Sequence, residues 1–114
     1  MKINSTTQAD NIIVELIGDI DAKTSPVVQE EVLPLFHPDS KILLDFSQVE
    51  YMSSAGLRIL LTLNRYASSK KSQMVLSGLS EEVKDVMSMT GFLKFFITCD
   101  TVTDGLKILE ESPN

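Results

Sequence analysis

Two adjacent serines, Ser53 and Ser54, have the setting in this sequence that best suits chemistry. They follow a predicted strand and precede the longest helical pattern, so they lie at the amino end of a helix. A phosphate on Ser54 would meet free backbone N–H groups and the positive end of the helix dipole, which both favour an anion. Arg58 stands one helical turn further on and could pair with that phosphate. The spacing predicts a site where phosphorylation changes the surface charge and leaves the fold intact.

The residues one helical turn from Ser54 form the surface that such a charge would affect. Leu57, Arg58 and Leu61 share that side of the helix. A phosphoryl group adds about −1.5 to −2 charges beside these apolar side chains and would repel a partner that must desolvate them. On spacing alone a plainer interpretation is favoured, in which Ser53 and Ser54 only cap the helix and the leucines pack beneath a neighbouring helix. The adjoining stripe is predicted to enter the core: Gly56, Ile59, Leu60, Leu63 and Ala67.

The other candidates for chemistry have ordinary explanations. Cys99 and His37 are the one thiol and the one imidazole, but Cys99 falls in a predicted core strand and His37 follows a helix end. Asp19 and Asp21 are two carboxylates in a turn, where such side chains commonly bond to the loop backbone. The sequence lacks the ligands of a zinc cage and any glycine-rich phosphate loop. We therefore predict no metal, no cofactor and no enzymatic activity.

Alternating strand and helix patterns carry these residues. Runs rich in apolar or β-branched residues predict strands at 2–7, 11–17, 41–45, 73–77 and 95–99. Capping residues predict helices that begin at Ser25, Ser54, Ser80 and Thr101. Pro34 is expected to end the first helix because proline removes a backbone donor, and Gly91 is expected to cap the third.

This order predicts an α/β fold in a single domain over residues 1–114. We expect a mixed, mostly parallel sheet of four to five strands with about four helices, the polar first strand lying at an edge. Binding sites in such sheets lie beyond the carboxyl ends of the strands. Residues 18–24, 46–54 and 77–80 are the loops at that end.

The charge distribution narrows the class of partner. The chain has 114 residues and a net charge of −6, which disfavours nucleic acid. Residues 1–40 carry 2 bases and 7 acids, residues 41–80 carry 5 bases and 2 acids, and residues 81–114 carry 3 bases and 7 acids. The candidate switch helix thus falls in the locally basic third. Because no apolar run approaches the ~20 residues of a membrane span, we expect a cytoplasmic protein without membrane insertion.

Residues 44–57 resemble the phosphorylation-site region of STAS domains, the family of bacterial anti-sigma-factor antagonists. Residues 44–46 read Leu-Asp-Phe, and residues 51–57 read Tyr-Met-Ser-Ser-Ala-Gly-Leu, close to the family's aromatic, Met or Ile, then Asp-Ser-Ser/Ala-Gly-Leu. Gly-Asp-Ile-Asp at 18–21 resembles the family's Gly-x-Leu/Ile-Asp loop. The stretch from Ser-Gly-Leu at 77–79 to Met-Thr-Gly-Phe at 89–92 resembles its fourth strand and third helix. The resemblance covers essentially the whole chain.

The resemblance implies a mechanism. The unmodified antagonist binds an anti-sigma factor, often a serine-protein kinase, and frees the sigma factor. The kinase phosphorylates the serine at the helix start, which ends the association, and a PP2C-type phosphatase resets the switch. Ser54 matches the phosphoacceptor by position, and Ser53, where the family commonly has Asp, is the second candidate. The implied partner-binding set is Asp21, Thr24, Ser53, Leu57, Arg58, Leu61 and Ser77.

Two other functions stay open at this point. A STAS-like accessory subunit of a membrane transport complex would dock on a transporter ATPase without phosphorylation. A small nucleotide-binding domain would use the basic middle third and a helix amino end, although the missing glycine-rich cradle argues against it.

Overall fold

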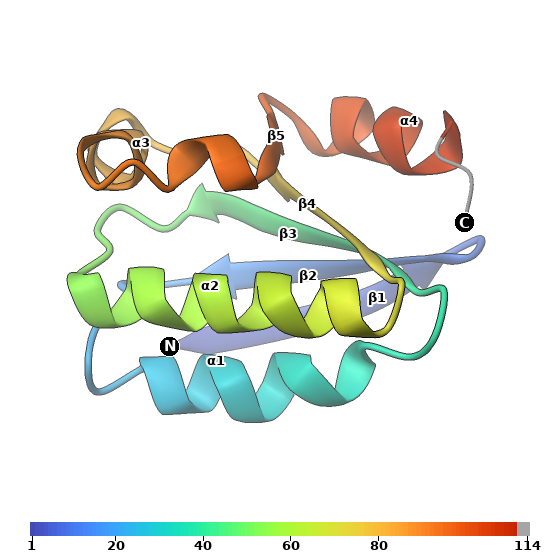
Figure 1. The fold of residues 1–114 in the computed structure, drawn as a ribbon, viewed down its shortest axis with the longest axis horizontal. Helices are drawn as coiled ribbons and strands as arrows, with labels where there is room; N and C mark the ends of the chain where they lie inside the picture. The colour runs from blue at the N-terminus through green and yellow to red at the C-terminus, as the bar shows by residue number, and fades with distance from the viewer. Residues whose placement is uncertain (112–114) are drawn as a thin grey trace.

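A computed structural model describes residues 1–111 as a five-stranded sheet with helices on both faces (Figure 1). The strands are β1 Lys2–Gln8, β2 Asn11–Ile17, β3 Lys41–Gln48, β4 Gln73–Ser77 and β5 Ile97–Cys99. The helices are α1 Ser25–Val32, α2 Ser54–Ser69, α3 Glu81–Met89 and α4 Val102–Glu111, with short 3₁₀ turns at η1 Leu33–Leu35 and η2 Leu93–Phe95. The α/β prediction is confirmed in element order and in the number of helices.

The strands lie in chain order across the sheet, from β1 to β5. β1 pairs with β2 as an antiparallel hairpin, and the other pairs are parallel. The mixed, mostly parallel sheet with a polar edge strand is therefore confirmed. Because parallel strands end at the same side of a sheet, the loops that follow β2, β3 and β4 meet at one end of the molecule.

The core has two parts, one on each face of the sheet. Figure 1 shows α1 and α2 side by side along one face and α4 on the other. β3 is buried on both sides, since Ile42 and Leu44 join the larger core while Leu43 packs in the smaller one with Val75 and Leu109. A strand covered on both faces reads as a continuous apolar run, which is why residues 42–44 lack alternation.

Hydroxyl side chains cap α2, α3 and α4, but α1 differs from the prediction, because Ser25 is its first helical residue and the preceding Thr24 makes no side-chain cap bond. The Ser80 hydroxyl accepts a hydrogen bond from the Val83 N–H at 3.1 Å, and the Thr101 hydroxyl accepts one from the Asp104 N–H at 3.1 Å. Each bond satisfies an N–H that would otherwise lack a partner inside the first turn. α1 ends at Val32 because the chain turns into η1, which contains Pro34. The predicted starts of α3 and α4 and the predicted end of α1 are confirmed.

The fifth strand differs from its predicted extent of 95–99. Residues up to Phe95 belong to η2, in which the Phe95 N–H donates to the Phe92 carbonyl, and β5 keeps only three residues. Because residues 93–95 form this turn and Phe96 is buried in the larger core, only Ile97–Cys99 pair with β4. Cys99 is consequently half-buried rather than a core residue.

Two helical glycines provide a test of this packing. A Cβ added at Gly56 would lie 2.6 Å from the Ile20 carbonyl oxygen, whereas one added at Gly105 would meet the Leu43 Cδ1 methyl at 2.5 Å. A terminal methyl can rotate aside, but a backbone carbonyl held in a sheet-edge loop cannot. We expect Gly56→Ala to lower the free energy of unfolding by about 3 kcal/mol and Gly105→Ala by about 1 kcal/mol or less. Urea denaturation measures both, and equal losses would contradict the packing described.

Candidate functional site

The loop after β2 and the loop after β3 are joined by backbone hydrogen bonds. The Ile20 N–H donates to the Tyr51 carbonyl at 3.0 Å, and the Ser53 N–H donates to the Ile20 carbonyl at 2.9 Å. Ile20 and Met52 also form an isolated parallel bridge, and both side chains are buried. Gly56 lets the first turn of α2 approach this bridge closely. The two loops therefore form one platform that fixes the amino end of α2.

The two serines on this platform have different environments. Ser53 has an extended backbone, is half-buried, and its hydroxyl accepts a long hydrogen bond from the Gly56 N–H at 3.4 Å. Ser54 is the first residue of α2, and its side chain is exposed. The helix start predicted at Ser54 is confirmed, with Ser53 as its N-cap. Ser54 is the serine that an external enzyme can reach in this conformation.

The predicted partner-facing side of α2 is only partly at the surface. Arg58 is exposed and Leu61 is half-buried, but Leu57 is only 4% exposed and belongs to the larger core. The prediction that Leu57 contacts a partner directly is therefore wrong. This leucine packs in the larger core, in line with the plainer interpretation. The stripe from Gly56 to Ala67 is buried as predicted.

A groove runs beside Ser54 between α1 and α2. It encloses about 320 Å³ and is lined by Ala22, Ser25, Pro26, Gln29, Ala55, Arg58, Ile59 and Thr62. Its walls combine small, apolar and amide side chains with the Arg58 guanidinium. Such a mixture suits contact with another protein better than enclosure of a small ligand.

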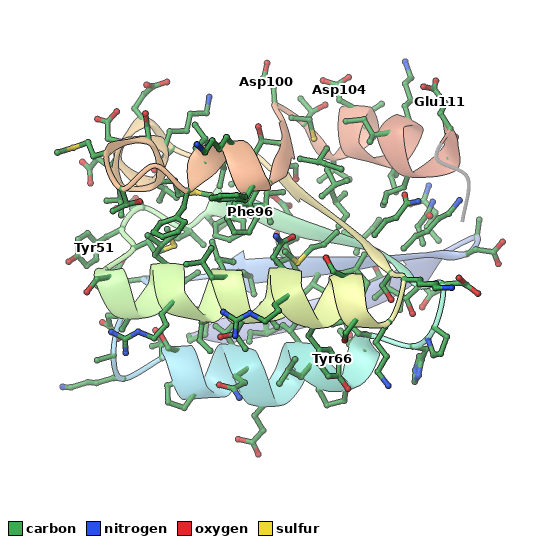
Figure 2. All side chains as sticks on the ribbon, viewed as in Figure 1. Tyr51, Tyr66, Phe96, Asp100, Asp104 and Glu111 are labelled. Atoms are coloured by element: carbon green, nitrogen blue, oxygen red, sulfur yellow. The ribbon has the colours of Figure 1, made fainter. Side chains whose placement is uncertain are left out.

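An acidic hollow lies near the amino end of α2, and the sequence reasoning missed it. It encloses about 410 Å³ and is lined by Asp19, Glu50, Tyr51, Ser80, Glu81 and Glu82. Tyr51 is 48% exposed, and Figure 2 shows its side chain beside the first turn of α2. The signal in the sequence was acid in three separate segments, namely the loops after β2 and β3 and the first turn of α3, which only the fold brings together.

Asp21 and Thr24 hold the shape of the loop after β2. The Asp21 carboxylate accepts hydrogen bonds from the N–H groups of Lys23 at 2.9 Å and Thr24 at 3.1 Å. The Thr24 hydroxyl donates to the Asp19 carbonyl at 2.8 Å. The Thr24 N–H, and then the Lys23 N–H, hold the pKa of Asp21 below its usual value of 3.8. The turn-forming interpretation of Asp21 is thus confirmed.

Ser77 and Cys99 lie behind the surface. Ser77 is fully buried at the end of β4, and its hydroxyl is without a hydrogen-bond partner among residues 1–111. Its predicted direct contact with a partner is therefore corrected. Burial, with Asp104 and Asp100 nearby, raises the pKa of the Cys99 thiol, which disfavours a thiolate nucleophile. His37 bonds to Ser40 and Ser72 at the opposite end of the parallel strands, so no thiol–imidazole pair forms.

Within residues 1–111, no group of three or more His, Cys, Asp or Glu side chains is arranged to hold a metal ion. Over the same range, no helix combines the length and the apolar character needed to cross a bilayer.

The lowered pKa of Asp21 makes a pH-dependent prediction. A carboxyl whose pKa is lowered by folding stabilises the native state above its usual value of 3.8, and this stabilisation is lost as the pH falls below 3.8 and through the lowered pKa of the folded state. We expect Asp21→Asn to lower the melting temperature near neutral pH, and the difference from the unsubstituted protein to shrink progressively as the pH falls below 3.8. Thermal denaturation across this range measures the effect. The matched control is Glu31→Gln on α1, and a constant difference for Asp21→Asn would contradict the assignment.

Comparison with known proteins agrees with this geometry. The chain is 33% identical over 84 residues to an anti-sigma-B factor antagonist of Listeria monocytogenes, covering 72% of this chain and 73% of that protein. The crystal structure of a putative anti-sigma factor antagonist from Thermotoga maritima superposes with a TM-score of 0.85 at 20% identity, covering 96% of this chain and 95% of that one.

The same fold also occurs inside a transporter. The structure of the murine Slc26a9 anion transporter superposes with a TM-score of 0.83 at 16% identity, covering 94% of this chain and 19% of that one. The model of the STAS domain family matches residues 2–105. With nearly the whole chain matched, and with the loops and helix start in the arrangement that the motifs predict, this chain belongs to the STAS domain family.

Proposed function

We propose that this protein is an anti-sigma-factor antagonist, a protein-binding module that releases its partner when Ser54 is phosphorylated. The observation that carries the proposal is the exposure of Ser54 at the first position of the 16-residue helix α2, while the Ser53 hydroxyl serves as the cap. Relatives of this chain bear the name anti-sigma-B factor antagonist, which supports the same function. The protein acts by binding in the cytoplasm and catalyses no reaction.

The proposed partner-binding surface is formed by the side chains that remain accessible around Ser54. Arg58 and Leu61 extend it along α2, and the groove against α1 adjoins it. Asp21 and Thr24 contribute by holding the loop that underlies this surface, since their polar atoms bond within the turn. Leu57 supports the surface from the core.

A phosphate on Ser54 would act on this surface through charge. Its oxygens would face the free N–H groups of the first turn, and Arg58, one turn later, could pair with them. The acidic hollow nearby adds carboxylates of Asp19, Glu50, Glu81 and Glu82 to the same end of the molecule. The added charge of about −2 therefore strengthens an existing negative field, and a partner that approached this end would have to desolvate it.

The proposed partner is an anti-sigma factor that is also a serine-protein kinase, with a PP2C-type phosphatase that removes the phosphate. The carboxylates of the acidic hollow repel phosphate ligands, which argues against the nucleotide-binding alternative and against nucleic acid.

The second candidate function is that of a transport-associated domain, because the same fold occurs in the Slc26a9 transporter. In that function the domain would dock on a membrane transport complex without phosphorylation. The two functions differ in one respect, namely whether charge at Ser54 changes binding.

Mapping of the phosphate tests the acceptor. We expect the partner kinase, isolated by affinity capture and supplied with ATP, to place a single phosphate on Ser54, as read by phosphopeptide mass spectrometry. Ser54→Ala should abolish the label. Ser53→Ala should keep the label but lower the free energy of unfolding by about 1 kcal/mol, because it removes the cap. Label on Ser53 alone would overturn the assignment.

Substitution by aspartate tests the switch. We expect Ser54→Asp to weaken capture of the partner at least about tenfold, because the charge lies on the contact surface. The melting temperature should stay nearly unchanged, since an acidic residue suits the first turn of a helix. Ser68→Asp, an exposed serine near the other end of α2, is the matched control and should bind normally. Unchanged binding by Ser54→Asp would favour the transport function instead.

A further inference from the structure

The open edge of the sheet along β1 has no role in the proposed function. β1 stands at one end of the strand order and pairs only with β2 (Figure 1). Six of its seven residues are exposed, with Ile3 the exception. The opposite edge strand, β5, has three residues and offers little length for pairing. β1 therefore presents the longer free row of backbone donors and acceptors.

Apart from one lysine at its start, β1 lacks the features that usually block pairing at an edge. Natural edge strands are blunted by proline, by charges in the strand, by bulges or by short length. β1 contains no proline, its register with β2 is regular across all seven pairs, and its one charge is Lys2 at the start. Thr6 and Thr7 favour the extended backbone. Because most side chains here are polar, an additional strand would pair reversibly rather than aggregate.

The hairpin geometry identifies which backbone groups face outward. Bonded and non-bonded pairs alternate along an antiparallel ladder. The two-residue turn between Gln8 and Asn11 makes these residues a bonded pair. Every second residue back from Gln8 is therefore bonded to β2. The N–H and C=O groups of the residues between them, Ile3, Ser5 and Thr7, point away from β2. Three outward residues in alternation form a complete pairing edge.

This edge is complementary to itself about Ser5. If two copies of β1 lie antiparallel with Ser5 opposite Ser5, Ile3 of each copy faces Thr7 of the other, and all outward groups meet outward groups. About six main-chain hydrogen bonds would form. The same register sets Lys2 of one copy opposite the neutral Gln8 of the other, so no like charges face each other directly along the paired strands.

We propose that two copies of this chain associate through antiparallel β1–β1 pairing, which joins two five-stranded sheets into one. A strand edge buries less than the roughly 1,600 Å² of a standard stable interface. Each copy also carries a net charge of −6, so association is weak and depends on protein concentration and salt. Ser54 follows β3, two strands away from β1, and the pairing is independent of the phosphorylation switch.

Sedimentation equilibrium of the untagged protein tests the association. We expect the weight-average mass to rise from 12.6 kDa toward twice that value as the concentration approaches about 1 mM. Ser5→Pro should remain at the monomer mass, because it removes the central outward N–H and proline is tolerated where an edge N–H faces solvent. Circular dichroism verifies that this variant is folded.

A second pair of variants keeps the proposal testable if Ser5→Pro does not fold. Ser5→Lys places like charges opposite each other across the two-fold axis and should weaken dimerisation several-fold, with partial recovery at high salt. Thr6→Lys adds the same charge to the next residue, which faces Asn4 and meets lysines of the other copy only diagonally, and should weaken dimerisation less than Ser5→Lys does. Equal dimerisation of Ser5→Lys and Thr6→Lys would overturn the proposal.

Backbone amide signals in NMR spectra locate the interface. On raising the concentration we expect shifts and slowed exchange at the amides of Ile3, Ser5 and Thr7. A mass that stays at 12.6 kDa up to about 1 mM, or changes centred on the exposed Phe95 and Ile97 near the opposite edge, would overturn the proposal. Ser54→Asp should dimerise unchanged, so failure here and failure of the phosphorylation switch give different results.

Discussion

The backbone hydrogen bonds between the loop after β2 and the loop after β3 determine where α2 begins and how Ser53 and Ser54 are presented. They pass through Ile20, whose N–H donates to one loop residue and whose carbonyl accepts from Ser53. Tyr51 and Ser53, which bond to Ile20, are separated from it along the chain by α1 and β3. Without this link the first turn of α2 would start from an unanchored loop. With it, the helix start is fixed relative to the sheet, and Gly56 can pack against the Ile20 carbonyl.

This constraint separates the roles of two chemically identical side chains. Ser53 is turned inward by its extended backbone and caps the helix, and Ser54 begins the helical turn facing solvent. Helix geometry then places Arg58 one turn further on. A modification at Ser54 consequently changes the field at the surface without removing a hydrogen bond that the fold uses. A charge-operated switch needs this separation between the residue that stabilises and the residue that signals.

The rest of the molecule supplies rigidity and leaves two unequal edges. β3, covered on both faces, ties the α1–α2 side to the α4 side through its alternating side chains. At one edge an apolar segment forms η2, and β5 has only three residues. At the other edge β1 stays long and polar. The acidic hollow and the β1 edge are separate surfaces, so binding at one need not disturb the other.

The order of the elements, the helix starts at Ser54 and Ser80 and the turn built by Asp21 follow from the sequence alone, because caps, turns and hydrophobic periodicity are local. The sequence also marks Ser54 as the candidate acceptor. The burial of Leu57 and Ser77, and the meeting of acids from two loops and α3 in one hollow, follow from the tertiary structure. Spacing along a helix shows which side chains share a side, but whether that side is covered depends on neighbours distant in the chain. The same reason explains β5, where apolar composition predicted a longer strand but residues 93–95 folded into η2 and Phe96 packed into the larger core.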